Sequence, residues 1–266
     1  MSADRPTTEA ETTAGAAGFA DTFAATALAQ LGRVATEQRP AVAAGGALIA
    51  GALASGGILH AYGTGHSRSV ALELVARAGG FIPTNLLAIK DLVLWGGLPP
   101  ETIRDPKLER EPGVAGSVLA LHDVRAGDVM VIASNSGVNP AVVEMARLVR
   151  ARSVPVIAVG SLTHSRAVPS RDASATTLFD NADVVVDTMT PLGDAVVPLP
   201  TGGSACGTST LSAVLIAQLL VAHAIGELGR RGVHVPVYRS MNTAGADAPN
   251  AEAEQAWAGR LRPVEA

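Results

Sequence analysis

The sequence predicts a three-layer α/β fold, in which a parallel sheet of about five strands has helices on both faces. Nearly half of the 266 residues are hydrophobic (48%), and only 3% are aromatic. Abundant Ala, Val, Leu and Gly are typical of strands that are buried on both faces. Short apolar runs are followed repeatedly by a Gly- or Ser-rich turn and then by an apolar helix pattern, which is the order of βαβ units.

The same composition along the chain predicts one domain with two tails. Residues 1–16, rich in Ala, Thr, Glu and Gly, predict a disordered N-terminal tail. A single domain is expected over residues 17–250, with N-terminal helices within residues 17–54. Residues 251–266 are expected to form a C-terminal tail.

Residues 41–67 contain no Lys, Arg, Asp or Glu, and the stretch is long enough to span a bilayer. It consists mainly of Ala and Gly rather than Leu, Ile and Phe, and it contains the pair Gly56-Gly57. We therefore predict a helix over 41–54, a turn and a buried strand over 58–62, without a membrane span.

The remaining elements follow in order. An amphipathic helix is expected over 19–38, ahead of Pro40. Apolar runs predict further strands over 128–133, 154–159 and 182–187. Helix patterns cover 69–78, 117–122, 140–151, 209–228 and 251–260, and the fourth of these is apolar nearly all round. Residues 84–116 and 162–181 are interpreted as loops.

The turn after the strand at 128–133 is rich in hydroxyl and amide side chains. Its residues are Ser134, Asn135, Ser136, Gly137, Val138 and Asn139. A turn of this kind at a helix N-terminus presents N–H groups and hydroxyls to one point and suits a phosphate without Lys or Arg. The alternative is an ordinary helix N-cap. Two serines and two asparagines within six residues favour phosphate binding.

A second turn, after the strand at 58–62, reads Gly63, Thr64, Gly65, His66 and Ser67. Its glycines permit a tight turn and close approach of a ligand. Arg68 leaves the dinucleotide pattern G-x-G-x-x-G incomplete, and the Gly-Lys-Ser/Thr of a P-loop is absent. Because both turns follow the carboxyl ends of parallel strands, where ligands bind in such sheets, we expect them to face one ligand.

These motifs resemble those of the sugar isomerase (SIS) domain family, in which a Gly-rich turn and a Ser-x-Ser-Gly turn bind sugar phosphates. The chain is most similar to the stand-alone bacterial SIS proteins over about residues 20–250. The further matching residues are Arg77 to Gly80, Gly127-Asp128 through Glu144 to Ala146, Ser161 to Ser165, Val168 to Arg171, Gly193 to Ala195 and Thr208 to Thr210. The resemblance implies a flavodoxin-like SIS fold, phosphosugar binding at both turns near Thr208, Ser209 and Thr210, and a homodimer whose partner chain completes the site.

Glu73 and His66 are the candidate catalytic residues. Glu73 lies in an apolar helix pattern, where a carboxyl group tends towards a raised pKa that suits a general base. The alternative is an ion pair with Arg77 at i+4. In related isomerases and in the muramic acid 6-phosphate etherase, a Glu lies about one turn further along this helix, near Ala76 and Arg77 here. His66 lies inside the binding turn, where it is available as an acid or as a ligand clamp.

The function we expect is an enzyme that acts on an amino-sugar 6-phosphate, removing the C2 proton and eliminating a group from C3. The alternatives are an aldose–ketose isomerase and a non-catalytic sugar-phosphate sensor. A net charge of −4 without a basic stripe gives nucleic-acid binding little electrostatic support. Cys206 is the only cysteine, and the first residues carry no basic signal region, so we expect a cytoplasmic protein. Neither a metal site nor a cofactor is expected.

Overall fold

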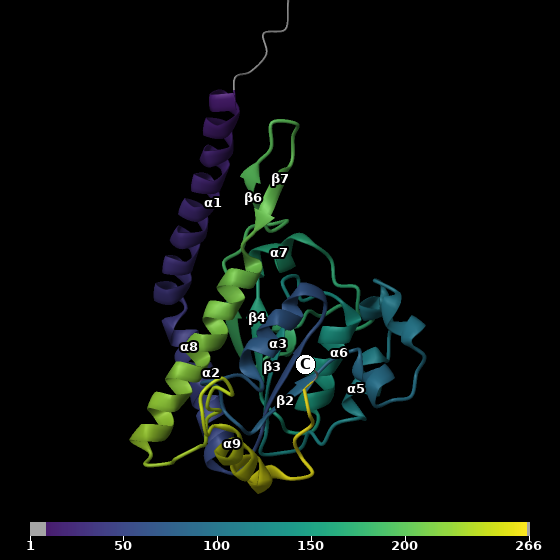
Figure 1. The fold of residues 1–266 in the computed structure, drawn as a ribbon. Coiled ribbons are helices and arrows are strands. Elements are labelled where there is room, and N and C mark those ends of the chain that lie inside the picture. The colour runs from purple at the N-terminus through teal and green to yellow at the C-terminus, as the bar shows by residue number, and fades with distance from the viewer. Residues whose placement is uncertain (1–8, 265–266) are drawn as a thin grey trace, which may run out of the picture.

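The computed structural model describes residues 9–264, and its centre is a parallel sheet of five strands (Figure 1). The strands lie in the order β2-β1-β3-β4-β5. They are β1 (Leu59–Gly63), β2 (Thr84–Leu87), β3 (Val129–Ala133), β4 (Val156–Gly160) and β5 (Val184–Asp187). The predicted three-layer α/β fold is confirmed.

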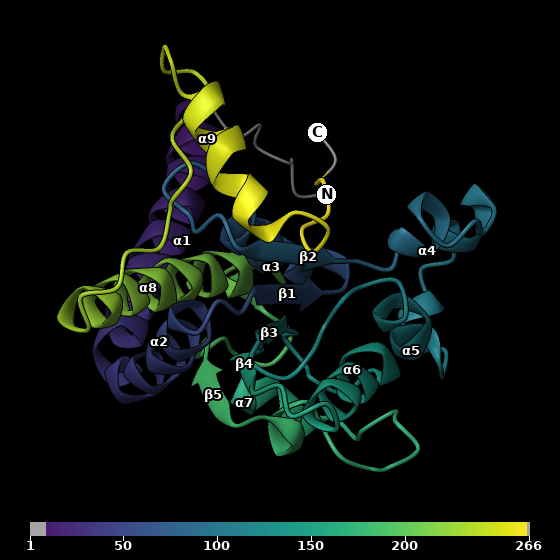
Figure 2. The same cartoon turned by 90° about the horizontal axis from the view of Figure 1, so that it is seen from below.

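Helices cover both faces of the sheet, as Figure 2 shows for α2 and α8 on one side and α5 and α6 on the other. The helices are α1 (Glu9–Glu37), α2 (Arg39–Ala54), α3 (Arg68–Leu74), α4 (Asp91–Leu94), α5 (Val114–Leu119), α6 (Pro140–Arg150), α7 (Leu162–Ala167), α8 (Ser209–Arg230) and α9 (Asp247–Glu254). Alternate residues of each strand face opposite sides. Val129 and Val131 therefore pack with α2, α3 and α8, whereas Met130 and Ile132 pack with α5 and α6.

The strand order places a switch point between β1 and β3. From β1 the chain moves outward to β2, and it then returns to the other side of β1 to form β3. Gly63 pairs with Ala133 at the ends of the two strands, so β1 and β3 end level with each other. The crevice beyond such a point is where ligands bind in open parallel sheets.

Helix α8 is the one helix among residues 9–264 that is long and apolar enough to cross a membrane. Its inward side chains, among them Ile216, Leu220 and Ala224, are fully buried against the domain. Core helices of folded domains share this length and composition, and the sequence likewise predicted a central helix at 209–228. The charge-free stretch 41–67 forms most of α2, the following turn and β1.

Strand β2 and a hairpin of β6 (Ala195–Pro198) and β7 (Ser204–Gly207) were missed by the sequence analysis. Strand β2 lies where residues 84–116 were interpreted as irregular, because it begins with the polar residues Thr84 and Asn85. Both are buried. The hairpin projects from the same end of the domain as the first turns of α1 (Figure 1). A short helix, α7, also occupies the start of the predicted loop 162–181.

Both predicted tails need correction. Residues 9–16 form the first turns of α1, because their Ala-rich sequence is compatible with helix and simply extends it, so the prediction of disorder was wrong for them. Residues 1–8 lie outside the described residues. Residues 251–264 are part of the domain rather than a separate tail, since Asn85 of β2 bonds to the backbone of Arg260 and Arg262 at 2.7 and 2.9 Å.

A buried ionic cluster centred on Asp128 lies at the amino ends of β1 and β3. The carboxylate, 1% exposed, accepts hydrogen bonds from His60 Nε2 (3.1 Å), from the Ile58 N–H (2.9 Å) and from Arg260 Nη2 (2.7 Å). Burial alone would raise the pKa of Asp128, but the donors around it lower that pKa to about 2. Burial lowers the pKa of His60, which is fully enclosed. The cluster therefore brings together His60, Asp128 and Arg260, which lie far apart in the chain.

Candidate functional site

The two predicted turns meet in one cavity of about 640 Å³ at the carboxyl ends of β1 and β3. Most of the predicted binding residues line it, from three separate segments. They are Thr64, Gly65, His66, Ser67, Ser134, Asn135, Ser136, Asn139, Ser209 and Thr210. Four further residues line the cavity, namely Glu109, His164, Asp194 and Gly207. The level ends of the two strands bring the turns together.

The first turn is built by its glycines. A Cβ atom at Gly63 would lie 2.6 Å from the Ser67 carbonyl oxygen, so only glycine allows the chain to fold back there. Gly65 has a φ of +53°, and the Ser67 N–H donates to the Thr64 carbonyl at 3.1 Å. The resulting turn leads directly into α3 and leaves His66 exposed at the cavity wall.

The second turn is held by the side chain of Ser134 and is not an ordinary helix N-cap, because α6 begins at Pro140 with Asn139 as its N-cap residue and without a side-chain cap bond. Ser134 is buried, and its Oγ accepts a bond of 3.0 Å from the Gly137 N–H. Gly137 has a φ of +67° and packs against Phe179. Within the described residues, no hydrogen bond takes up the N–H groups of Asn135 and Ser136 or the Ser136 hydroxyl. Ser134 therefore shapes the turn, and the next two residues present free donors at the cavity.

The N-terminus of α8 is already capped by a carboxylate. Asp194 accepts from the Thr208 and Ser209 N–H groups at 2.8 and 2.7 Å, and from the Ser209 hydroxyl at 2.6 Å. Thr208 is buried, does not line the cavity, and donates its hydroxyl to Gln30 at 2.9 Å. A negative charge at this helix end disfavours a phosphate there. Thr210 is the residue of this group that stays available to a ligand.

Glu73 does not line the cavity. Its carboxylate is paired with Arg77, which is the alternative that the sequence offered, and it also accepts from Gln218 Nε2 of α8 at 2.6 Å. Helix α3 ends at Leu74, because Val75 is extended and Ala76 has a φ of +51°. Of the two predicted catalytic residues, the structure brings only His66 to the cavity.

Glu109 is the carboxylate that reaches the cavity apart from Asp194. It lies in a single 3₁₀ turn, Leu108–Arg110, within the segment interpreted as a loop. Asn139 Nδ2 donates to Glu109 Oε1 at 2.8 Å, and Asn139 Oδ1 accepts from Arg171 at 2.9 Å. Asn139 therefore holds Glu109 in place rather than offering its own amide to a ligand. The sequence carried no signal for this, since residues 109 and 139 are linked only in the fold.

Asn135 and His164 complete the wall opposite the first turn. The side-chain nitrogen of Asn135 lies 3.4 Å from His164 Nδ1. Asn135 Oδ1 is buried and has no hydrogen-bond partner among the described residues. A buried acceptor of this kind is costly unless a donor arrives, so it marks a place for a ligand hydroxyl or amide.

Comparisons with known proteins find related sequences and related folds. The family model of the SIS domain matches residues 22–161. A UPF0309 protein of Streptomyces avermitilis is 40% identical over 228 residues, which cover 85% of this chain and 90% of that protein. The UPF0309 protein BH3325 of Halalkalibacterium halodurans is 37% identical, with 83% and 90% covered.

Two solved structures share the fold at low identity. A phosphoheptose isomerase from Francisella tularensis is 15% identical, with a TM-score of 0.55, over 79% of this chain and 97% of that chain. The E. coli CFT073 protein c3406, solved as a complex, is 14% identical, with a TM-score of 0.51, over 80% and 92%.

Proposed function

Because the chain belongs to the SIS-domain family, as its motifs predicted, we propose that it binds a phosphorylated sugar in the cavity between its two turns. The observation that carries this proposal is the pair of level strand ends, Gly63 and Ala133, which brings both turns to one cavity. The cavity volume of about 640 Å³ is in the range of small-molecule sites.

The phosphate is proposed to lie at the second turn. The free N–H groups of Asn135 and Ser136, the Ser136 hydroxyl and the first turn of α6 all favour an anion there. Asp194 makes the N-terminus of α8 the less favourable end. The sugar then extends past Asn135 Oδ1, which accepts from a hydroxyl or an amide N–H.

A binding experiment tests this placement. Calorimetry with N-acetylglucosamine 6-phosphate is expected to show about tenfold weaker binding for Ser136→Ala, the size of one lost hydrogen bond to a charged group. The matched control is Ser117→Ala on α5, whose hydroxyl bonds only to the Gly113 carbonyl, away from the cavity. Equal affinity of Ser136→Ala and the wild type would place the phosphate elsewhere.

We further propose that the protein is an enzyme acting on an amino-sugar 6-phosphate. In the open-chain aldehyde, a base removes the C2 proton to give an enolate, and the enolate expels the C3 oxygen substituent, which leaves as water or as an alcohol after protonation. Glu109 is better placed than Glu73 to be that base, because it lines the cavity and Glu73 does not. His66 is the proposed acid. General acid–base catalysis of this kind contributes about 10²–10⁴-fold.

Two alternatives use the same binding site. Return of the proton to C1 instead of loss of the C3 group gives an aldose–ketose isomerase. A non-catalytic sensor would bind the sugar phosphate and release it unchanged. The wall of Glu109, His66 and His164 favours an enzyme, since three titratable side chains converge on one cavity.

Proton NMR in D₂O distinguishes these functions. With N-acetylglucosamine 6-phosphate, elimination is expected to remove the C2 proton signal and to produce a vinylic signal. Exchange at C2 with a ketose product would indicate the isomerase, and unchanged spectra despite measurable binding would indicate the sensor. Glu109→Gln is expected to slow exchange at least 100-fold. Glu73→Gln is the matched control. If it slows exchange more than Glu109→Gln does, Glu73 rather than Glu109 is the base.

We also propose a cytoplasmic homodimer whose partner chain closes the site. Exposed apolar side chains on α1 and α8 support self-association, with Leu28 69% and Ile225 47% exposed. Analytical ultracentrifugation of wild type and Leu28→Glu tests the proposal. A monomeric wild-type protein would contradict it.

A further inference from the structure

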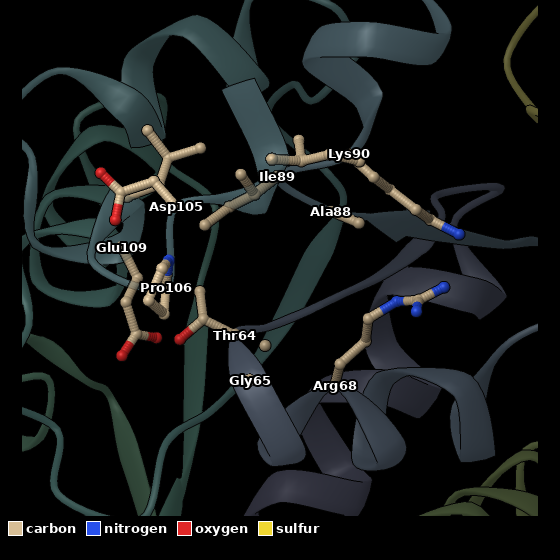
Figure 3. Close-up of a pocket in the computed structure, with 12 residues that line it drawn as sticks. Thr64, Gly65, Arg68, Ala88, Ile89, Lys90, Asp105, Pro106 and Glu109 are labelled. Atoms are coloured by element: carbon tan, nitrogen blue, oxygen red, sulfur yellow. The ribbon is translucent and has the colours of Figure 1, made fainter. Parts of the chain in front are cut away.

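The cavity between the two turns is lined by residues from separate segments, whose spacing the fold has to fix. The first turn and Glu109 also line a neighbouring cavity of about 460 Å³, which is drawn in Figure 3. Asn135, His164 and Thr210 do not line that neighbour, and they come from the second turn, α7 and α8. These three segments are connected behind the cavity through a buried side chain of α1, Gln30, which lines neither cavity.

Gln30 is a buried amide on the inward face of α1. Ala27 and Val34, three residues before it and four after it, are buried on the same face and are apolar, and Gln30 itself is 7% exposed. An amide in such a place is costly unless its donors and its acceptor are used. Gln30 therefore depends on polar partners from outside α1.

These partners lie in two segments beside the cavity. Gln30 Nε2 donates to the Ser212 hydroxyl at 2.7 Å and to the Thr188 carbonyl at 3.2 Å, and it lies 3.4 Å from Thr190 Oγ1. Gln30 Oε1 accepts from the Thr208 hydroxyl at 2.9 Å. Because a carbonyl oxygen only accepts, the Thr188 contact fixes which end of the amide is the nitrogen. All four partner residues are at most 1% exposed.

On one side, Gln30 fixes the beginning of α8. Thr208 is the residue before the helix, and the next two residues, Ser209 and Thr210, line the cavity. The amide bonds to both Thr208 and Ser212, which lie one helical turn apart, so it sets the depth and rotation of this end of α8 against α1. A shift of the amide therefore moves Thr210 relative to the ligand.

On the other side, the same amide is connected to the second turn and to α7. The Thr190 carbonyl accepts from the Ser161 hydroxyl at 2.6 Å, and the Ser161 N–H donates to the Asn135 carbonyl at 3.0 Å. Ser161 is also the N-cap residue of α7, where its Oγ accepts from the His164 N–H at 3.0 Å. The path that starts at Gln30 thus ends at two residues of the cavity, Asn135 and His164.

We propose that Gln30 is a positioning residue of the phosphosugar site, which sets the distance between the start of α8 and the second turn without touching the ligand. The inference rests on the proposed binding of a phosphorylated sugar in this cavity. A ligand that bonds at once to the N–H groups of the second turn and to Thr210 needs that distance to be right. Side chains one layer behind a site change affinity or activity by about 10–100-fold at metal sites, and the same support applies to other preorganised sites.

Calorimetry with N-acetylglucosamine 6-phosphate tests the inference. Gln30→Met keeps nearly the same length and the apolar contacts of the side chain but makes none of its hydrogen bonds. We expect this variant to bind the probe about tenfold more weakly than wild type, while circular dichroism shows a folded protein.

The bond between Gln30 and Thr208 can be tested from its other end. Thr208→Val removes the hydroxyl and Thr208→Ser keeps it, so Thr208→Ser should recover most of the affinity that Thr208→Val loses. The double variant Gln30→Met/Thr208→Val should bind no more weakly than Gln30→Met alone, because both substitutions break the same bond. If the two losses multiply instead, Thr208 acts on the ligand independently of Gln30 and the inference is wrong.

Two controls separate positioning from stability. Gln38→Met removes the tertiary bond of another glutamine, whose Oε1 accepts from the Asp187 N–H at 3.0 Å and which lines neither cavity. Arg260→Met removes a buried ion pair with Asp128 at the amino ends of the strands, opposite the site. Both controls are expected to unfold at lower urea concentrations and to bind the probe with wild-type affinity. If Arg260→Met binds as weakly as Gln30→Met, affinity simply follows stability and the inference is overturned.

The remaining outcomes separate this inference from the proposed function. If Gln30→Met is less stable in urea but binds the probe as tightly as wild type, phosphosugar binding stands and the positioning role is refuted. If Gln30→Met does not fold, equal affinity of Thr208→Val and Thr208→Ser refutes the role instead. If wild-type protein binds neither N-acetylglucosamine 6-phosphate nor inorganic phosphate, the proposed function fails and this inference fails with it.

Discussion

Replacing Arg260 by Met removes the guanidinium from the buried cluster beneath β1 and β3. Arg260 is 14% exposed and donates from Nη2 to both carboxylate oxygens of Asp128, at 2.7 and 3.0 Å. Its Nε also donates to Asp123 at 2.9 Å. Met retains most of the aliphatic length of the side chain, so the substitution mainly removes the charge and these bonds.

The expected cost to the free energy of unfolding is about 3 kcal/mol. Removing one partner of a buried ion pair costs about 3–5 kcal/mol, because the other charge is left without compensation. The lower end applies here, since Asp128 keeps hydrogen bonds from His60 and from the N–H groups of Ile58 and Arg125.

Urea unfolding at pH 7, followed by circular dichroism, measures this cost. Arg125→Met is the matched control, because Arg125 pairs with Asp123 at 3.7 Å while its side chain is 60% exposed. An exposed pair of that kind contributes at most about 1 kcal/mol. A double-mutant cycle with Asp128→Asn should give a coupling energy of about 2 kcal/mol between residues 128 and 260. If Arg260→Met costs no more than Arg125→Met, the reasoning is refuted.

Three further predictions concern the cluster and the second turn. Since the folded state lowers the pKa of Asp128 to about 2, the stability that ionised Asp128 contributes is present above about pH 4 and is lost as the pH falls towards 2. Carbon-13 NMR should find the Asp128 carboxyl still ionised at pH 3, and a titration midpoint near pH 4 would contradict this. Burial lowers the pKa of His60, so the unfolded chain takes up a proton that the folded chain does not. Stability should therefore fall below about pH 6.5 in wild type and less so in His60→Gln, and identical urea profiles would rule this out. Gly160→Ala should destabilise the fold by about 1–3 kcal/mol and weaken phosphosugar binding, because its Cβ would lie 1.9 Å from the Ser134 carbonyl oxygen. The control is Gly51→Ala in α2, whose Cβ meets nothing within 4 Å and which should instead stabilise the fold by about 0.5–1 kcal/mol. If Gly160→Ala leaves the free energy of unfolding unchanged, the second turn can shift to make room for the Cβ and the reasoning fails.

Three of the central strands were predictable because their sequences are mostly apolar. The runs at 58–62, 128–133 and 154–159 lie within two residues of β1, β3 and β4. Burial on both faces favours apolar side chains, and the two polar residues in these runs that are fully enclosed, His60 and Asp128, are buried as a hydrogen-bonded pair. Strand β2 was not predictable in this way. The amide of its Asn85 is satisfied by backbone groups 175 and 177 residues later, a pairing that no local pattern contains.

In the candidate site too, the features set by local sequence were predictable and those set by tertiary contacts were not. The meeting of the two turns could be predicted, since the carboxyl ends of parallel strands share one edge of the sheet. Glu109 could not, because its position depends on a hydrogen bond to Asn139, 30 residues away. Glu73 was chosen for its apolar neighbours, but periodicity does not tell which side of a short helix faces a cavity. Its pairing with Gln218 of α8 is a tertiary contact.

The contacts of residues 260–262 with β2 and with Asp128 also set an order of events during synthesis. Buried polar groups at the amino ends of β1, β2 and β3 acquire their last partners only after this late segment has left the ribosome. A nascent chain without it holds a buried carboxylate and an edge strand with incomplete hydrogen bonding, both of which favour non-native association. The domain is therefore expected to complete its sheet only once residues 260–262 are available, rather than strand by strand.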